Sequence, residues 1–560
     1  MKNPQLPAPV IRADAGPFWE AAQQGKLLLK RCGACTQAHF YPRPHCPFCG
    51  APHTEWIEAA GSGRVYSFSI IRAAARPTAA VVVELEEGVS LTSIVVDADV
   101  HALAIGDPVV VTTIPAEGGQ RLPVFTTEAA NRARAYAARA LQASQQAAGV
   151  ARDHAPMAWR SAAVVGAGTM GIGIATALIR AGIDVCLIDQ GEAALQRARE
   201  QVQANLAAEQ ARGRLSAEQL QQAIARLRSS VRIEEVAGAN LVIEAVWEQM
   251  GLKRDVFAQL DAHADADAIL ATNTSTLDID RIADATRRPG AVIGLHFFTP
   301  AHVMPLLEIV RGPRTQVDTV AAAQQLAREL HKTGVVVGIC DGFVGNRLMI
   351  AREREAARLL LEGALPQQVD RVLREFGLPM GTFELADMTS GIELGYRLRQ
   401  ETGVKEPIVD GLVALDRLGQ KAGKGYYRYE AGQRKPLVDP EVTAFIEGLS
   451  AAQGITRHRI PDIEVRDRLV LPMVNEGARL LEEGIAERAG DIDVIWQRGF
   501  GWPAWKGGPM YYADEVGLTE VRNRMAALEA AHGERFRAAP LIHHLAAIGG
   551  RFTDPQIGHS

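Results

Sequence analysis

The segment AAVVGAGTMGIGIATALIRAGIDVCLID, which begins at Ala162, constrains the fold of this chain more than any other part. It reads as an apolar strand, a glycine-rich turn, a helix and a second strand. Gly166, Gly168 and Gly171 stand in the G-x-G-x-x-G pattern. The first glycine allows a tight turn, the second lets the backbone approach a pyrophosphate, and the third lets helix and strand pack closely. The segment predicts a parallel α/β domain that binds a dinucleotide at a helix N-terminus.

Two further residues extend this predicted cofactor site. Asp189 ends the second strand, about 20 residues beyond the glycine turn. A carboxylate there accepts hydrogen bonds from ribose hydroxyls and repels a 2′-phosphate, which favours NAD over NADP. Met170, inside the motif, is included in the cofactor-binding set. The alternative is a glycine-rich turn without a ligand, and the flanking strand, helix and Asp189 count against it.

Changes in composition divide the 560 residues into segments, since a chain of this length exceeds one ordinary core. Residues 1–128 hold short β-branched runs separated by Gly and Pro, which predict a small β-barrel or sandwich. Residues 129–158 are rich in Ala, Arg and Gln and predict a linker helix. Residues 159–339 alternate strand and helix signals, as in a Rossmann-type α/β domain. Residues 340–435 and 455–555 are mostly helical.

The helical part contains an internal repeat. RLLLEG at Arg358 recurs as RLLEEG at Arg479, and FGLP at Phe376 recurs as FGWP at Phe500. Both copies continue to an Ala-Asp pair followed by Gly. Three short motifs that recur in the same order predict a duplicated all-α domain.

A helical hairpin is predicted between Gly191 and Arg228. It is broken at ARGRLSAEQ, where Ser216 and Gln219 have the spacing of a capping box.

Four cysteines near the N-terminus read C-x-x-C, ten residues, then C-x-x-C: Cys32, Cys35, Cys46 and Cys49. Four thiolates from two such knuckles can bind Zn²⁺ tetrahedrally. A redox C-x-x-C needs only one pair, and disulfides are rare in the cytosol. The pattern therefore predicts a structural zinc site, with His39 and His45 beside it. Cys186 and Cys340 lie in apolar strand contexts and are expected to be core thiols.

Composition excludes several classes of function. The net charge of −5 and the absence of a long basic run argue against nucleic-acid binding. No stretch approaches the roughly 18 apolar residues of a membrane span. The opening MKNPQLPAPV lacks the apolar core of a secretory signal, so a cytoplasmic protein is expected.

A candidate catalytic pair follows the cofactor strand. His296 ends an apolar strand, and Glu308 stands twelve residues later. An imidazole beside a fixed carboxylate is the usual arrangement for a general base. A strand-end histidine that only makes structural hydrogen bonds is the alternative.

The segments ATNTSTLDI, IGLHFFTPAHVMPLLEIV, CDGFVGNRL and GQKAGKGYY, together with LVIEAVWEQMGLKRDVF, resemble the 3-hydroxyacyl-CoA dehydrogenase family from Ser161 to the C-terminus. The resemblance implies NAD-dependent oxidation of an (S)-3-hydroxyacyl-CoA to the 3-ketoacyl-CoA, with the helical hairpin along coenzyme A. It implies a tandem C-terminal domain, as in multifunctional β-oxidation enzymes of fatty acid metabolism. It also implies an active-site set in which every position is occupied: Glu248, Lys253, Ser275, His296, Glu308 and Asn346.

By this resemblance His296 removes the hydroxyl proton, Glu308 orients the imidazole, and Ser275 and Asn346 hydrogen-bond the reacting oxygen or the thioester. Glu248 and Lys253 are assigned near the nicotinamide ribose and the substrate. Each residue has a structural alternative. The Glu248–Lys253 pair could be solvated at a helix start, Ser275 could be an N-cap, and Asn346 could cap the first helix of the helical domain.

The front module, with PFWEAAQQGKLLLKRCGAC, FYPRPHCPFCG and GSGRVYSFSII, resembles zinc ribbons followed by an OB-fold, of the DUF35 type. Because such modules accompany thiolases and acyl-CoA enzymes, a thiolase or acyl-CoA partner is implied. An OB-fold also binds nucleic acid, but no basic and aromatic platform is visible. Alternatives for the whole chain are a 3-hydroxyadipyl-CoA-type dehydrogenase of aromatic degradation, an enzyme for free 3-hydroxy acids, or a non-catalytic acyl-CoA-binding scaffold.

Overall fold

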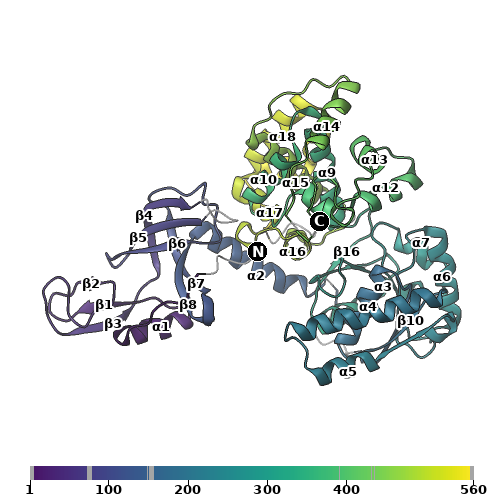
Figure 1. Ribbon diagram of the computed structural model, residues 1–560, viewed down its shortest axis with the longest axis horizontal. Coiled ribbons are helices and arrows are strands. Elements are labelled where there is room, and N and C mark those ends of the chain that lie inside the picture. The colour runs from purple at the N-terminus through teal and green to yellow at the C-terminus, as the bar shows by residue number, and fades with distance from the viewer. Residues whose placement is uncertain are drawn as a thin grey trace. The chain divides into compact units, whose positions relative to one another are not determined.

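The computed structural model describes residues 6–71, 78–147, 149–150, 157–389, 391–430, 432–433 and 435–554 (Figure 1). These residues form two compact units. One is made mainly of the chain up to Tyr136, and the other holds most of the remainder. Within the described ranges, no helix has the length and apolarity needed to cross a membrane.

The amino-terminal unit contains a small sheet and a closed barrel. Helix α1 (Gly16–Gln23) precedes a three-stranded sheet of order β2-β1-β3, with β1 (Leu28–Cys32), β2 (Ala38–His39) and β3 (Thr54–Glu58). Alternate residues of the next strands point inward and fill a barrel of order β4-β5-β6-β8-β7. Its strands are β4 (Ser62–Ile71), β5 (Thr78–Leu85), β6 (Ser90–Val95), β7 (Pro108–Pro115) and β8 (Arg121–Thr127). The predicted all-β front module is confirmed.

Helix α2 (Glu128–Ser144) leads into an eight-stranded sheet of order β11-β10-β9-β12-β13-β14-β15-β16. Its strands read as continuous apolar runs because helices cover both faces of such a sheet. They are β9 (Ser161–Val165), β10 (Asp184–Ile188), β11 (Leu227–Ser230), β12 (Leu241–Glu244), β13 (Ile269–Thr272), β14 (Val292–Phe297), β15 (Leu306–Val310) and β16 (Thr333–Val337). The helices of this domain are α3 (Thr169–Arg180), α4 (Glu192–Ala211), α5 (Ala217–Ala225), α6 (Met250–His263), α7 (Ile279–Ala283) and α8 (Val317–Glu329).

The strand order reverses between β9 and β12, and this switch point is where α/β sheets bind dinucleotides. All neighbouring strands are parallel except β14 and β15. The capping box predicted for the hairpin is confirmed, since Ser216 and Gln219 bond each other's backbone N–H. The predicted extent of the hairpin is wrong at its end. Residues Leu227–Ser230 form edge strand β11, because they pair with β10 instead of extending α5.

The helical region holds two copies of one arrangement. The first has α9 (Gly345–Glu362), α10 (Pro366–Phe376), α11 (Thr382–Met388), α12 (Gly391–Thr402) and α13 (Pro407–Ala414), followed by α14 (Pro440–Ala452). The second has α15 (Asp462–Glu482), α16 (Ala489–Gly499), α17 (Pro509–Val516), α18 (Leu518–His532) and α19 (Pro540–Ile548). Asp370 accepts two backbone N–H bonds from the start of α11, and Asp493 does the same at α17. The same buried aspartate, bound to the first N–H groups of a helix, occurs in both copies and supports the predicted duplication.

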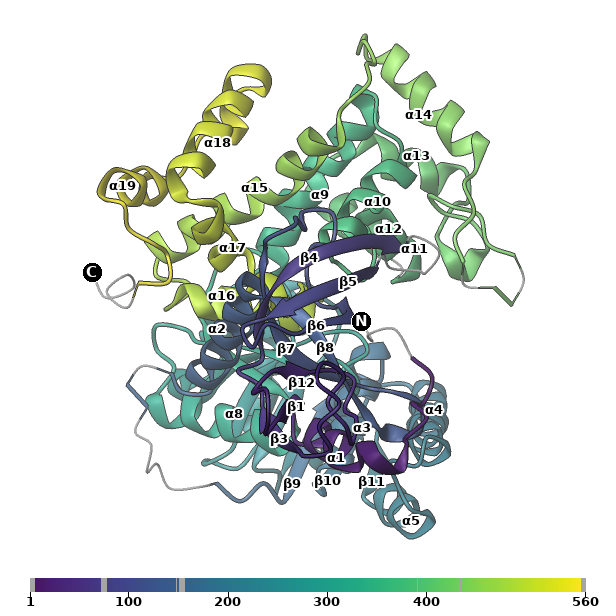
Figure 2. The same ribbon diagram turned by 90° about the vertical axis from the view of Figure 1, so that its left-hand side faces the viewer.

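The leading helices of the two copies, α9 and α15, pack side by side (Figure 2). Arg468 of α15 is fully buried and donates to Glu355 of α9 at 3.2 Å. Glu362 is a second carboxylate partner of the same guanidinium group. Breaking one partner of a buried ion pair is costly, so this network fixes one copy against the other.

Candidate active site

The glycine turn has the geometry that its sequence predicts. Gly166 has a φ of +111°, and a side chain there would meet the carbonyl oxygen of Ala245 at 2.5 Å. A Cβ on Gly171 would fall on the carbonyl oxygen of Gly166, so helix α3 packs directly on the turn. Around Gly168, the N-cap of α3, the space is open. The exposed N-terminus of α3 therefore offers its free N–H groups to a phosphate.

Asp189 lies at the carboxyl end of β10 and braces this turn. Its carboxylate accepts a bond from the N–H of Ala167 at 2.8 Å and one from the N–H of Gly191 at 3.1 Å. The partly buried Met170 receives a hydrogen bond on its sulfur from the Thr299 hydroxyl. The residues of the predicted cofactor set around the glycine turn thus meet at one edge of the sheet.

His296 and Glu308 form a buried pair. The antiparallel register of β14 and β15 places them directly opposite each other. The imidazole Nδ1 lies 2.7 Å from one carboxylate oxygen of Glu308. The other oxygen accepts the N–H of Gly345 at 2.9 Å, where α9 begins. Because Glu308 has no exposed surface and both its oxygens are occupied, the carboxylate holds the ring in one orientation.

Aromatic rings surround the imidazole. Phe298 lies with its ring centroid 4.4 Å from that of His296, and Phe343 lies at 5.6 Å. Only 7% of the histidine side chain is exposed. Low exposure keeps bulk water from competing for the imidazole nitrogens.

Glu248 organises the turn that carries Ser275. One of its carboxylate oxygens accepts bonds from the Thr274 hydroxyl at 2.6 Å and the Ser275 N–H at 2.7 Å. The Ser275 hydroxyl lies 3.2 Å from the same oxygen. The N-cap alternative for Ser275 is wrong, since Asp278 caps the helix that follows.

Lys253 is fully buried, so the solvated-pair alternative is also wrong. Its ammonium group contacts Glu244 at 2.7 Å and Glu248 at 3.4 Å. Burial opposes the charge of Glu248, but Lys253 and the bonds from Thr274 and Ser275 together lower its pKa. Lys253 therefore stands behind Glu248 and supports it.

Glu244 is a residue that sequence reasoning missed. It ends β12, has no exposed surface and accepts bonds from Lys253 and from the Thr272 hydroxyl, both at 2.7 Å. A carboxylate in the last position of an apolar strand of a parallel sheet was the available signal, because catalytic groups gather at that edge.

Asn346 lies in the first turn of α9, next to the glycine that binds Glu308. Val344 is the N-cap of this helix, so the capping alternative for Asn346 is wrong. Asn346 is therefore linked to the His296–Glu308 pair, because the start of α9 carries both Asn346 and the N–H group that binds Glu308.

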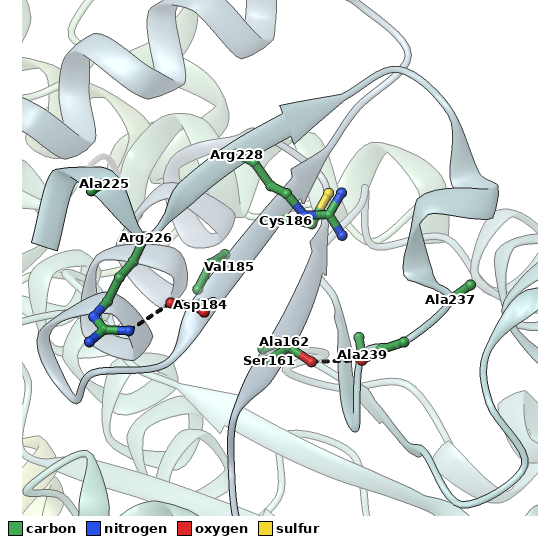
Figure 3. A pocket seen from close by; sticks show the side chains of 11 residues that line it. Ser161, Ala162, Asp184, Val185, Cys186, Ala225, Arg226, Arg228, Ala237 and Ala239 are labelled. Atoms are coloured by element: carbon green, nitrogen blue, oxygen red, sulfur yellow. Dashed lines mark hydrogen bonds and ion pairs between the residues drawn. The ribbon is translucent and has the colours of Figure 1, made fainter. Parts of the chain in front are cut away.

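A pocket of about 340 Å³ lies elsewhere, at the amino ends of β9 and β10 (Figure 3). Asp184 and Arg226 on its wall are paired at 2.7 Å, and the Ser161 hydroxyl donates to the Gly238 carbonyl. This edge is opposite the glycine turn, and these polar groups are satisfied, so the pocket is not the dinucleotide site.

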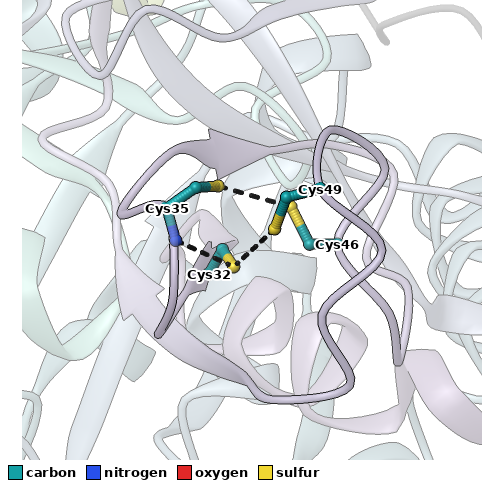
Figure 4. A group of neighbouring side chains, drawn as sticks. All are labelled: Cys32, Cys35, Cys46 and Cys49. Atoms are coloured by element: carbon teal, nitrogen blue, oxygen red, sulfur yellow. Dashed lines mark hydrogen bonds between the residues drawn. The ribbon is translucent and has the colours of Figure 1, made fainter.

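The four N-terminal cysteines converge on one centre (Figure 4). Their sulfur atoms lie within 4.8 Å of one another, and the pairs Cys32–Cys49 and Cys35–Cys46 are 3.6 Å apart. Sulfurs around tetrahedral zinc lie roughly 3.8 Å apart, from Zn–S bonds of about 2.3 Å. Hydrogen bonds from backbone N–H groups, chiefly that of Cys35 and then that of Ala34, lower the pKa of Cys32 to about 6. The donor set and its spacing fit a structural zinc ion.

A glycine-rich phosphate turn, a carboxylate after the second strand and a buried imidazole–carboxylate pair define a dinucleotide-dependent dehydrogenase fold. Models of known protein families support this class. The "3-hydroxyacyl-CoA dehydrogenase, NAD binding domain" matches residues 161–340, and the corresponding C-terminal domain matches residues 342–429 and again 465–554. The chain belongs to the 3-hydroxyacyl-CoA dehydrogenase family, with its own NAD-binding domain and a doubled C-terminal domain. The family and fold predicted from the sequence are confirmed.

The front module matches two further models. The rubredoxin-like zinc ribbon domain of ChsH2 covers residues 19–55, and the C-terminal OB-fold domain of ChsH2 covers residues 56–113. The predicted zinc ribbon and OB-fold are confirmed.

Similar proteins come from several organisms. The human peroxisomal bifunctional enzyme is 40% identical over 65% of this chain and 53% of its own length, and the zebrafish (Danio rerio) protein is 38% identical over 70% and 57%. The dehydrogenase part of multifunctional enzyme 1 from C. elegans is 30% identical, with 73% of this chain and 96% of that one covered, at a TM-score of 0.55. A 3-hydroxybutyryl-CoA dehydrogenase from Escherichia coli is 27% identical, over 70% and 99%, at a TM-score of 0.60. The chain spans little more than half the length of the human and zebrafish enzymes.

Proposed function

We propose that this protein oxidises an (S)-3-hydroxyacyl-CoA to the 3-ketoacyl-CoA with NAD⁺. The observation that carries the proposal is the His296–Glu308 pair, buried and held at 2.7 Å, with the second carboxylate oxygen fixed by Gly345. A non-catalytic scaffold has no need for a carboxylate whose oxygens are both committed to an imidazole and its support.

The pair is suited to proton abstraction. With its Nδ1–H donated to Glu308, the imidazole leaves Nε2 free to accept a proton from the substrate hydroxyl. Glu308 then stabilises the imidazolium that forms. Bound NAD⁺ supplies the hydride acceptor in this chemistry.

Ser275 and Asn346 are proposed to position the substrate. The Ser275 turn is held by Glu248, and Asn346 sits beside Gly345 at the start of α9. We assign their hydroxyl and amide to the reacting oxygen and the thioester. Such positioning is worth up to roughly 7 kcal/mol or more in favourable cases.

Glu248 and Lys253 are proposed to shape the nicotinamide end of the cofactor site. Because Lys253 is enclosed, it acts by holding Glu248 in place.

The α4–α5 hairpin is proposed to lie along coenzyme A. Arg212 and Arg214 at its bend leave 60% and 59% of their side chains exposed, and both share the buried Glu209 with Arg180. Three guanidinium groups around one carboxylate leave a net positive charge for phosphates. Replacing Arg212 and Arg214 by Gln is expected to raise KM for CoA thioesters without lowering kcat.

The front module is proposed to dock a thiolase, which would take the ketoacyl product. Support comes from its kinship with DUF35-type modules and from exposed apolar side chains on it, Phe48 at 61% and Tyr66 at 64%. Co-purification of a thiolase should be lost when residues 1–128 are deleted. Association that survives the deletion would show the docking idea to be wrong.

The central test is NADH turnover with a panel of 3-hydroxyacyl-CoAs, including 3-hydroxyadipyl-CoA. Wild type should react, and His296→Ala should lose roughly 10³-fold or more of kcat while it retains NADH binding. Equal activity of the variant, or no turnover with any thioester, would refute the proposal. Activity on free 3-hydroxy acids equal to that on thioesters would refute the CoA assignment.

A further inference from the structure

An aromatic side chain of the second helical copy lies next to the residues that surround the proposed catalytic pair. Phe500 follows α16 and meets Phe298 edge-on, with ring centroids 5.6 Å apart. Phe298 in turn packs on the imidazole of His296 at 4.4 Å. The rings of Phe500, Phe298 and His296 thus form a continuous series from the second copy to the proposed base.

The same ring also touches the other half of the pair. A Cβ built on Gly345 would meet the ring of Phe500 at 2.7 Å, so the ring lies directly against this glycine backbone. The N–H of Gly345 is the group that holds the second oxygen of Glu308. One side chain therefore packs behind the supports of both His296 and Glu308.

Phe500 is itself firmly anchored. Its ring stacks on the fully buried Trp496 at 4.3 Å, and its N–H donates to the Trp496 carbonyl. The guanidinium group of Arg352, from α9, lies 5.2 Å from the Trp496 ring. A ring fixed from behind in this way can restrict the motion of the rings in front of it.

We infer that Phe500 is a positioning residue for the catalytic pair, so that the second helical copy completes the active site. This inference rests on the proposed function. Phe500 acts through Phe298 and Gly345, and touches neither proton nor hydride.

The test is Phe500→Leu in the full chain, which keeps an apolar side chain and removes the ring. We expect kcat to fall about tenfold, the scale of one or two lost aromatic contacts, with KM for NADH changed less than about twofold. Phe383→Leu is the matched control, because Phe383 is a buried ring of the first copy, 4.5 Å from Tyr426 and away from the pair. Its kcat should stay at the wild-type level.

A double-mutant cycle separates positioning from general destabilisation. Because part of the effect of Phe500 passes through Phe298, the variant with both changed to Leu should lose clearly less activity than the sum of the two single losses. Fully additive losses, unchanged kcat in Phe500→Leu, or an equal loss in Phe383→Leu would each overturn the inference.

If wild type turns over no hydroxyacyl-CoA, the proposed function fails, and NMR of ¹³C-labelled histidines still decides the positioning. The His296 signal, assigned by its loss in His296→Ala, should shift or broaden in Phe500→Leu and stay unchanged in Phe383→Leu. An unchanged signal in Phe500→Leu overturns the inference.

Discussion

Glu308→Gln tests the reasoning about the catalytic pair most directly, because it changes charge and hydrogen bonding with almost no change in shape. The carboxylate accepts Nδ1–H of His296 on one oxygen and the N–H of Gly345 on the other, at 2.7 and 2.9 Å. A glutamine has one oxygen and one NH₂ group. One of the two donors must then face another donor in a site without exposed surface.

Both orientations of the amide are unfavourable. If its oxygen faces Gly345, its NH₂ donates to Nδ1, the ring proton moves to Nε2, and the base is lost. If its oxygen faces His296, the N–H of Gly345 is buried without an acceptor, which costs about 1–3 kcal/mol. The equivalent Asp→Asn change in serine proteases lowers kcat about 10⁴-fold. We expect roughly 10³–10⁴-fold here, or about 4–5.5 kcal/mol in activation free energy.

NADH absorbance with acetoacetyl-CoA or a 3-hydroxyacyl-CoA measures kcat, and thermal unfolding measures stability. Asp261→Asn is a matched control, since Asp261 is a mostly buried carboxylate that binds Arg287 and Arg288 and does not contact the pair. A Glu308→Gln variant with kcat within about tenfold of wild type would refute the assignment of Glu308 as the partner of a general base.

Three further predictions concern groups around the site. Lys253→Met should destabilise the fold by about 3–5 kcal/mol in urea unfolding, because it leaves the buried Glu244 carboxylate without its cation; a loss under about 1 kcal/mol contradicts this. Burial opposes ionisation of Glu248, but Lys253 and the hydrogen bonds from Thr274 and Ser275 together outweigh it and lower the pKa. Its carboxylate therefore stabilises the fold above the ordinary pKa of about 4.3, and this stability is lost as pH falls lower. Melting temperature should thus fall more steeply with acid in wild type than in Glu248→Gln, and parallel curves would disprove the linkage. Cys46→Ser should lower bound zinc and expose the ribbon to protease while NADH turnover persists; an unchanged zinc content would exclude Cys46 as a ligand.

Local features were readable from the sequence alone. The glycine turn at Gly166, the capping box at Ser216 and the cysteine knuckles depend on groups a few residues apart, so spacing predicts them. The duplication was also visible, because the motifs at Arg358 and Phe376 recur in the same order at Arg479 and Phe500.

Contacts between distant segments could not be read in this way. The twelve-residue separation of His296 and Glu308 predicts a pair only weakly, and the antiparallel register of β14 and β15 is what sets them opposite each other. Strand β11 was missed because its four residues have little pattern of their own and are held by pairing with β10.

The sequence by itself determined the fold class and the dinucleotide turn, and it predicted the zinc ligands and the proposed base, since each rests on short-range geometry or on a distinctive short motif. Only the tertiary structure decided that Glu244 holds Lys253, that Gly345 holds Glu308, and that Phe500 of the second copy packs against Phe298 and Gly345. These contacts arise where elements far apart in the chain are packed together, and neither strand nor helix periodicity encodes which element will be the neighbour.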